Sequence, residues 1–275
     1  MTSKRLKTFA IVLFLAAGSA VNLVPLLWMA INSFKSEQEY ATHPVGLPRV
    51  WTWSNFSKAW EIAHLGTYFW NSVFVTLASV VLTVFLGALA SYFLSRFEFR
   101  ARKWVYGSFM LGMVIPIHAT LIPIFLLMQK IGLLDTRLSL ILPYTAFHLS
   151  ITIFILVGFM STFPKDIEES AVMDGSGVFR IFWSIILPMT RPALATVVIL
   201  NFIYNWNEFL FALVLINDSA LKTLPLGLAN FAGRETTNQT LQMAALTMAL
   251  VPIIVFYLAL QKQLVQGMTA GAVKG

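Results

Sequence analysis

Acidic and glycine residues gather in one short stretch of a chain that is otherwise mostly apolar. Residues 168–177 read EESAVMDGSG, while 58% of the 275 residues are hydrophobic and only 11% are charged. No Ser-His-Asp arrangement, H-E-x-x-H motif or Cys/His metal spacing accompanies these residues. The sequence therefore predicts no catalytic residue, metal site or cofactor, and the stretch must serve another purpose.

The residues around this stretch predict a short helix. Ser161 or Thr162 can cap it, Pro164 suits a first helical turn, and the acidic residues that follow favour the positive end of the helix dipole. We expect this helix over about 164–173. Because it lies between two apolar runs, it belongs to a segment outside the bilayer.

A tight turn and a second helix should follow. Gly175 and Gly177 supply backbone freedom for the turn, and the apolar sequence VFRIFWSIIL then predicts a helix that Pro188 and Pro192 stop. The whole segment, 163–192, is longer than an ordinary loop. It also carries apolar residues outside the membrane, which predict a partner that covers them. These residues are Ile167, Ala171, Val172, Met173, Val178 and Phe179.

The composition places the chain among membrane proteins with several spans. The mean hydropathy is +0.77, and a water-soluble protein of this length could not bury so much apolar surface. The apolar runs are continuous rather than alternating, so they predict helices. Six runs approach or exceed the ~20 residues that cross a bilayer. They lie near 9–33, 71–95, 104–129, 138–162, 193–216 and 241–261.

Basic residues predict how these helices are oriented. Lys4, Arg5 and Lys7 precede the first run, and a second basic cluster lies at 96–103. Lys and Arg are enriched on the cytoplasmic side, so both termini are predicted to be cytoplasmic. The first run continues past its small residues to Trp28, which favours a retained helix over a cleaved signal peptide.

The spacing within the polar segment resembles a known signature. Glu169-Ser170-Ala171 is followed after three residues by Gly175, and nine residues later by Ile185-Ile186-Leu187-Pro188. This resembles the EAA signature of importer permeases of the ATP-binding cassette (ABC) superfamily, with Ser170 in place of the first alanine. The runs IGLLDTRLSLILPYTAF, NWNEFLFALVL, TLPLGLANF and GMTAGAVKG are similar to the carbohydrate-uptake branch, in particular to its maltose-G-type subunits.

The resemblance covers residues 9–275 and implies an all-α fold, the ABC type I importer permease. It implies a single transmembrane domain over 1–275, with 163–192 as a cytoplasmic coupling helix-turn-helix and 262–275 as a cytoplasmic tail. The implied partners are a second homologous permease in a heterodimer, two ATP-binding subunits and an extracytoplasmic solute-binding protein. The implied substrate is an oligosaccharide or related carbohydrate, and the implied location is the cell membrane of a bacterium or archaeon. No nucleic-acid partner is expected.

The chain is expected to be a non-catalytic subunit, because it lacks G-x-x-x-x-G-K-[ST] and ATP must be hydrolysed by a partner. The resemblance implies two sets of contacts with that partner. The coupling set is Glu169, Ser170, Ala171, Asp174, Gly175, Ile185, Leu187 and Pro188. The tail set is Gly267, Thr269, Gly271 and Lys274.

Polar residues also interrupt the fifth apolar run. Asn201, Asn205 and Glu208 are spaced four and then three residues apart, so a continuous helix places them on one face. A charge facing lipid costs about 3 kcal/mol, so this face should point to the bundle interior or a cavity. Two roles stay open for it: lining the translocation path with hydrogen bonds to sugar hydroxyls, or a structural pair between the two permease subunits.

A stand-alone proton-coupled carrier is the alternative function. It would use Glu208 with His118 and His148 of the third and fourth runs, and six spans could form half of such a carrier. The histidines, however, lack a second carboxylate in their runs, which favours hydrogen bonds in helix packing. The carrier also leaves 163–192 without a purpose.

Overall fold

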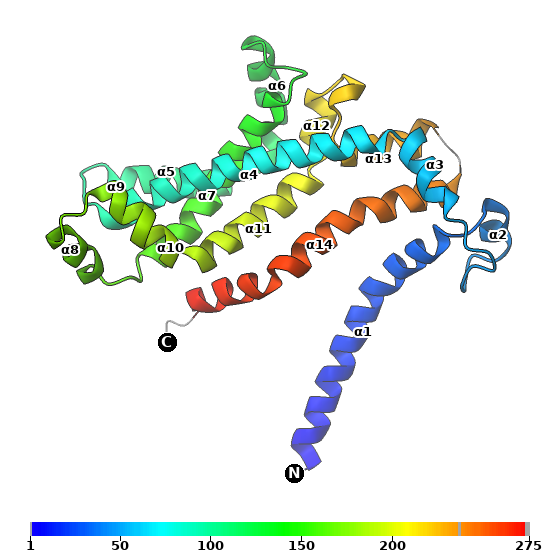
Figure 1. Ribbon diagram of the computed structural model, residues 1–275, viewed down its shortest axis with the longest axis horizontal. Helices are drawn as coiled ribbons and strands as arrows, with labels where there is room; N and C mark the ends of the chain where they lie inside the picture. Colours follow the sequence, from blue (N-terminus) through cyan, green and yellow to red (C-terminus); the bar gives the residue numbers. More distant parts are fainter. Residues whose placement is uncertain (1, 236–237, 273–275) are drawn as a thin grey trace. The chain divides into compact units, whose positions relative to one another are not determined.

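The computed structural model describes residues 2–235 and 238–272, with the side chains of 7–233, 238–259 and 261. This part of the chain folds into helices joined by short connections, and it contains no strand (Figure 1). The α-helices are α1 (Thr2–Asn32), α2 (Glu37–Thr42), α3 (Ser54–Ile62), α4 (Leu65–Arg96), α5 (Arg102–Val114), α6 (Leu121–Lys130), α7 (Leu138–Met160), α8 (Asp166–Met173), α9 (Val178–Ile181), α10 (Leu187–Met189), α11 (Arg191–Asn207), α12 (Leu210–Leu215), α13 (Leu224–Asn230) and α14 (Gln239–Ala272). The 3₁₀-helices are η1 (Ile117–Thr120) and η3 (Ser219–Leu221), and the π-helices are η2 (Phe182–Ile186) and η4 (Phe231–Glu235).

The chain divides into two compact units, the first formed by residues 1–66 and 227–251 and the second by 67–226 and 252–275. In the first unit, a polar and aromatic cluster follows α1. The Asn55 side-chain amide donates to the carbonyls of Ser33 and Lys35, at 2.8 Å each, and the Phe34 ring packs against Trp53 at 4.8 Å. These contacts order the connection between α1 and α3.

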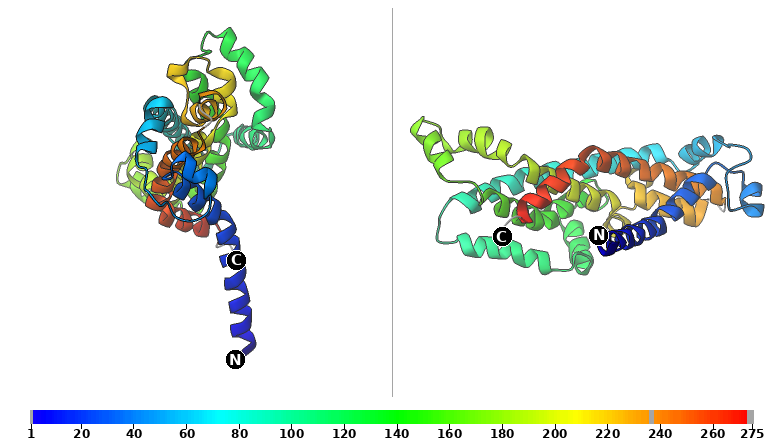
Figure 2. Two further views of the ribbon diagram at one scale, coloured as in Figure 1. Left: turned by 90° about the vertical axis from the view of Figure 1, so that its right-hand side faces the viewer. Right: turned by 90° about the horizontal axis from the view of Figure 1, so that it is seen from below.

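The second unit is a helical bundle with α7 in contact with α5, α11 and α12. One apolar cluster packs α4, α7 and α12 around Tyr144 and Phe211. A second packs α4, α7, α8 and the helices after it around Tyr92, Met160 and Phe182. The segment α8–α9 lies at one end of this unit (Figure 1 and the right-hand view of Figure 2). The bundle therefore holds α8 through apolar contacts with long helices.

Among the described residues, four helices are long and apolar enough to cross a membrane: Lys7–Asn32, Leu65–Arg96, Leu138–Met160 and Gln239–Ala259. The number becomes six if each of two bent pairs is one span, Arg102–Val114 with Ile117–Lys130 and Val178–Met189 with Arg191–Asn207. The all-α architecture predicted from the continuous apolar runs is therefore confirmed.

The third apolar run, predicted as one span near 104–129, is broken at Pro116. The helices on either side of Ile115 and Pro116 meet at a bend of 95°. Ile115 is extended, with φ −72° and ψ 118°, because the ring of the following proline disfavours the helical conformation at the residue before it. Pro143, in contrast, lies within the continuous helix α7.

Helices α4 and α7 approach each other closely at Gly87. A Cβ atom added there would lie 2.5 Å from Cγ2 of Thr152, whose Oγ1 accepts a 3.0 Å hydrogen bond from the Asn201 side-chain amide. Rotation of Thr152 to make room would break that bond. Gly87 thus permits a contact that joins α4, α7 and α11.

We expect Gly87→Ala to destabilise the protein by about 1–3 kcal/mol, the usual cost of overpacking a core. The matched control is Gly107→Ala on α5, where nothing lies within 4 Å of an added Cβ. The control should retain or gain stability, because alanine favours helix more than glycine. Thermal unfolding of both variants in detergent measures the difference, and equal midpoints would contradict the close contact.

Candidate functional site

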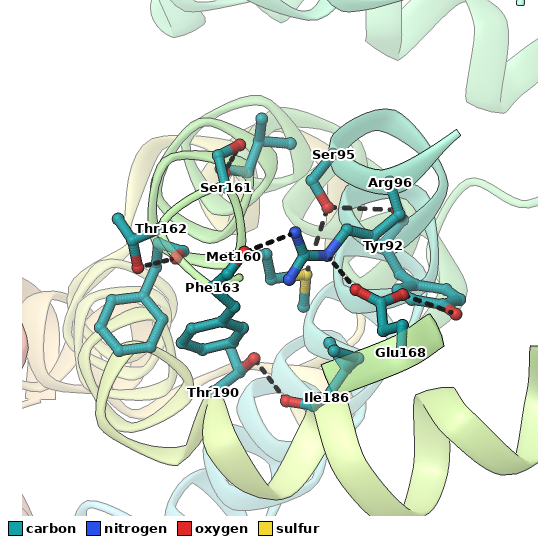
Figure 3. Close-up of polar contacts among 12 residues, drawn as sticks. Tyr92, Ser95, Arg96, Met160, Ser161, Thr162, Phe163, Glu168, Ile186 and Thr190 are labelled. Carbon is teal, nitrogen blue, oxygen red and sulfur yellow. Dashed lines mark hydrogen bonds and ion pairs between the residues drawn. The ribbon is translucent and has the colours of Figure 1, made fainter. Parts of the chain in front are cut away.

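The first candidate functional element is α8, which begins at Asp166 rather than at the predicted residue 164. Its first turn carries Asp166, Glu168 and Glu169, as the helix dipole favours. The predicted caps are wrong, because the hydroxyls of Ser161 and Thr162 instead donate to the carbonyls of Val157 and Phe159, each at 2.7 Å (Figure 3). Both hydroxyls therefore bond to carbonyls in the last turn of α7 and leave the start of α8 without a side-chain cap.

One face of α8 packs against the bundle. Ala171 is only 8% exposed and belongs to the apolar cluster that contains Tyr92, Met160 and Ile181. Glu168, three residues earlier and therefore on the same face, pairs with Arg96 at the end of α4. The small side chain at 171 lets α8 lie close to the long helices.

The opposite side of α8 is open. Glu169, Ser170 and Asp174 are exposed, and the Ser170 hydroxyl donates back to the Asp166 carbonyl at 2.8 Å. Val172 and Met173 are also exposed, Met173 to 87%. Five of the exposed residues of this segment, which we call the docking face, are Glu169, Val172, Met173, Val178 and Phe179.

A glycine turn ends α8. Gly175 has φ +82°, a conformation that side chains other than glycine rarely adopt, whereas Gly177 has an ordinary φ of −76°. The Ser176 N–H donates to the Ala171 carbonyl and the Gly175 N–H to the Val172 carbonyl, both at 2.9 Å. This is the Schellman pattern, so Gly175 alone needs to be glycine for the predicted turn.

The helix after the turn is longer and less regular than predicted. Pro188 does not stop it, because α9, the π-turn η2 and α10 run on to Met189, where the chain bends by 76° into α11. The ring of Pro188 removes one backbone donor and the π-turn just before it changes the hydrogen-bond register. Ile185 and Leu187 pack against the second apolar cluster and hold the segment in place.

Comparison with known proteins assigns the chain to a family. Residues 79–270 match the family model described as the binding-protein-dependent transport system inner membrane component. The chain belongs to this family. The permease is 37% identical over 255 residues to the diacetylchitobiose uptake system permease protein NgcG of Streptomyces coelicolor, covering 92% of this chain and 84% of that one. It is 34% identical over 277 residues to the melibiose/raffinose/stachyose import permease protein MelC of Bacillus subtilis, covering both chains completely.

The fold of the permease is that of an ABC importer. A chain of a bacterial ABC transporter involved in the import of the acidic polysaccharide alginate superposes with a TM-score of 0.84 at 24% identity, covering 95% of this chain and 98% of the other. The predicted type I importer architecture is thereby confirmed. The proton-coupled carrier receives no support from the family or from these relatives.

In the fifth run of the permease, the predicted polar stripe is interrupted. Asn201 and Asn205 are buried and point to the interior, as expected, but α11 ends at Asn207 and Glu208 lies beyond it in an extended conformation. The Glu208 carboxylate accepts hydrogen bonds from the N–H groups of Phe211 at 2.8 Å and Ala212 at 3.2 Å. It therefore caps α12 instead of continuing the face of α11.

Glu208 has a third donor in the Tyr144 hydroxyl of α7, at 2.5 Å. His148, one turn further on α7, has its Nδ1 2.8 Å from the Tyr144 carbonyl and its ring stacked on Tyr204 of α11 at 5.4 Å. These are contacts of helix packing. His118 lies exposed in η1, after the break at Pro116.

Two outcomes concern residues at the edges of the predicted site. In the predicted tail contact, Gly267, Thr269 and Gly271 lie in the part of α14 whose side chains are not described, and Lys274 lies outside the described residues altogether.

The sequence reasoning also missed the pairing of Arg96 with Glu168. It treated Arg96 only as one of the basic residues that orient the helices, because the burial that indicates an ion pair is visible only in the structure.

We expect Glu208→Gln to lower the free energy of unfolding by about 1–3 kcal/mol. Three groups donate to the two carboxylate oxygens of Glu208, and glutamine would replace one of these oxygens with an amide nitrogen that cannot accept. The control is Glu98→Gln, an exposed carboxylate in the turn after α4. Thermal unfolding of the purified permease in detergent measures both variants. Unchanged stability of Glu208→Gln would contradict the capping role.

Proposed function

We propose that this permease is the membrane subunit of an importer that moves an oligosaccharide or related carbohydrate. The relatives named above are permeases for diacetylchitobiose and for melibiose, raffinose and stachyose, which supports a carbohydrate substrate. The maltose-G-type likeness remains a proposal about the branch. The location proposed is the cell membrane, with both termini cytoplasmic and the six helical runs as spans.

The energy for import comes, in this proposal, from ATP hydrolysis in partner subunits. The partners are two ATP-binding subunits, a second homologous permease and an extracytoplasmic solute-binding protein. Solved structures with the same fold support the kind of partner, since one is an alginate ABC transporter in complex with a periplasmic protein bound to an alginate pentasaccharide. The permease itself contributes the path and the transmission of motion.

One observation carries the proposal, namely the docking face at the end of the second unit. Apolar side chains that stay exposed beside charged residues indicate a protein partner. Val172, Met173 and Phe179 are open to a partner, and Glu169 beside them can pair with a basic residue of the ATPase. Asp174 and Gly175 form the turn between the two helices, and Ala171, Ile185 and Leu187 pack in or against the apolar cluster that holds these helices. Pro188 follows in α10. Substrate transport by alternating access then follows from movement of this segment with the ATPase. The tail residues around Gly267 are proposed as a second contact with the same partner.

The role of the fifth run is proposed from its burial. Asn201 bonds Thr152 and Glu208 bonds Tyr144, so both join α7 to the segment after the bend. This supports a structural role within the chain over direct contact with sugar. Asn205 lies between them on the buried side and is assigned the same role.

The proposal is tested first by reconstitution. The permease is combined in liposomes with the ATPase, second permease and binding protein encoded beside it, and uptake of radiolabelled raffinose, melibiose and diacetylchitobiose is measured. ATP-dependent uptake of one of these sugars is expected. Uptake that continues without ATP and collapses with an uncoupler would overturn the proposal in favour of a carrier.

Met173→Asp should weaken association with the ATPase on the order of tenfold, equivalent to ~1.4 kcal/mol for loss of an interface side chain. The control is Val45→Asp, an apolar residue that is 80% exposed in the first unit and predicted to lie on the opposite side of the membrane. Copurification of tagged ATPase with each variant measures the difference. Equal recovery of ATPase would show that Met173 is not at the interface.

Gly175→Val should leave the permease in the membrane and the ATPase bound, but it should lower the sugar imported per ATP hydrolysed several-fold. A β-branched residue cannot easily hold φ +82°, so the turn must change and α8 must move relative to α9. Gly175→Asn is the matched control, because asparagine tolerates this conformation. Normal transport by the valine variant at normal expression contradicts the role of the turn.

A further inference from the structure

Two neighbouring glutamates of α8 face opposite ways. Glu169 belongs to the open docking face, whereas Glu168 points to the bundle and its Oε1 lies 2.6 Å from Nε of Arg96 (Figure 3). The Glu168 side chain is only 16% exposed and that of Arg96 only 5%. An acidic run that would be an ordinary solvated helix start is therefore divided between an inner ion pair and an outer surface.

Arg96 joins the end of α4 to two other parts of the second unit. It is the last residue of α4, its Nη1 donates to the Phe163 carbonyl at 3.0 Å, and its guanidinium lies over the Phe163 ring, 5.8 Å from the centroid. Phe163 belongs to the connection between α7 and α8. A single planar side chain thus joins the end of α4 to this connection and to the first turn of α8.

Tyr92 lies one turn before Arg96 on α4 and supports the same carboxylate. Its hydroxyl is 3.5 Å from Glu168 Oε2, at the limit of a hydrogen bond, and its ring packs in the apolar cluster that includes Ala171. Glu168 is therefore held between two residues of one helix, which fixes its direction as well as its distance.

The ion pair adds something that apolar packing does not supply. Contacts such as those of Ala171 resist separation but are not directional, so a short helix could still rotate or slide on them. A buried ion pair is weak evidence for stability, since apolar residues of similar size often stabilise as well. The hydrogen bonds around the pair, from Arg96 Nη1 to the Phe163 carbonyl and from the Tyr92 hydroxyl to Glu168, are directional and require a defined geometry.

We propose that Arg96 is a positioning residue that locks α8 to the cytoplasmic end of α4 through Glu168. A push on the docking face then moves α4 and the bundle together with α8, instead of moving α8 over the bundle. This inference rests on the proposed function, in which the docking face binds the ATPase. It assigns to Glu168 a role inside the permease and leaves Glu169 for the partner.

The test compares Arg96→Gln, Glu168→Gln and the double variant in the reconstituted importer. The readouts are ATP hydrolysis, uptake of radiolabelled raffinose (or of diacetylchitobiose where the uptake panel selects it), and the ATPase retained on the permease. Each single variant is expected to keep the ATPase and its hydrolysis while sugar imported per ATP falls by at least about fivefold, the lower end of typical coupling between sites. The double variant should fall no further than the singles, because both changes remove the same link.

The control is Arg100→Gln, which removes an exposed positive charge from the same cytoplasmic turn. It should import at the wild-type ratio. A purely structural role of Arg96 would lower hydrolysis and uptake in parallel with the amount of folded protein, and the ratio would not move. An unchanged ratio in Arg96→Gln and Glu168→Gln with the ATPase bound overturns the inference.

Arg96→Lys covers the case in which Arg96→Gln does not fold. Lysine keeps the charge but cannot bond Glu168 and the Phe163 carbonyl in the same planar geometry, so its ratio should be reduced. Hydrogen exchange of the α8 amides should also be faster in Arg96→Lys, and wild-type exchange with a wild-type ratio overturns the inference. Failure of the proposed function has a different signature, since Met173→Asp would then retain the ATPase.

Discussion

The satisfaction of backbone hydrogen bonds in an apolar environment is the constraint on which this structure depends. Within hydrocarbon each unpaired N–H or C=O costs several kcal/mol, so the chain must remain helical or replace the bonds wherever a helix stops. Glu208 shows the replacement directly, because its carboxylate accepts the first N–H groups of α12 after α11 has ended. The one acidic residue of this run is thus used where the backbone needs an acceptor.

The same constraint explains the different breaks in the chain. The bend at Pro116 follows from the proline itself, which prevents the residue before it from being helical. Pro188 is tolerated without a break because the π-turn before it changes which carbonyls accept hydrogen bonds. Gly175 ends α8 outside the apolar runs, with two backbone bonds that satisfy the last carbonyls. The ends of α8 and α11 therefore use different means of pairing backbone groups: a glycine turn after α8, and the Glu208 carboxylate after α11.

Much of the fold could be predicted from the sequence because the determining signals are long and local. The continuous apolar runs predicted helices. The glycine at 175 predicted a turn, and the positive φ of Gly175 in the structure is the conformation that needs a glycine there. The contributions of Glu208 and Arg96 could not be predicted, because both depend on distant residues. Tyr144 is 64 positions from Glu208, and Glu168 is 72 positions from Arg96, separations at which no spacing rule applies. The caps at Ser161 and Thr162 were mispredicted because a hydroxyl that can cap the next helix can equally bond the last turn of the previous one.

Helix α8 has a buried side and an exposed side, and its sequence predicts only part of this division. Helical periodicity places Glu168 and Ala171 on one side, but it does not say which side meets the bundle. Burial answers that question: the small residue at 171 and the paired carboxylate face inward, leaving Met173 and Glu169 outward. In the proposed complex, the partner binds an apolar and acidic surface whose opposite side is paired with α4. Under that proposal, the contacts of Glu168 with α4 carry movement of α8 into the long helices. No residue of the described chain indicates which carbohydrate is carried: of the two buried asparagines for which path lining or a structural role stayed open, Asn201 donates its side-chain hydrogen bond to Thr152 of the same chain.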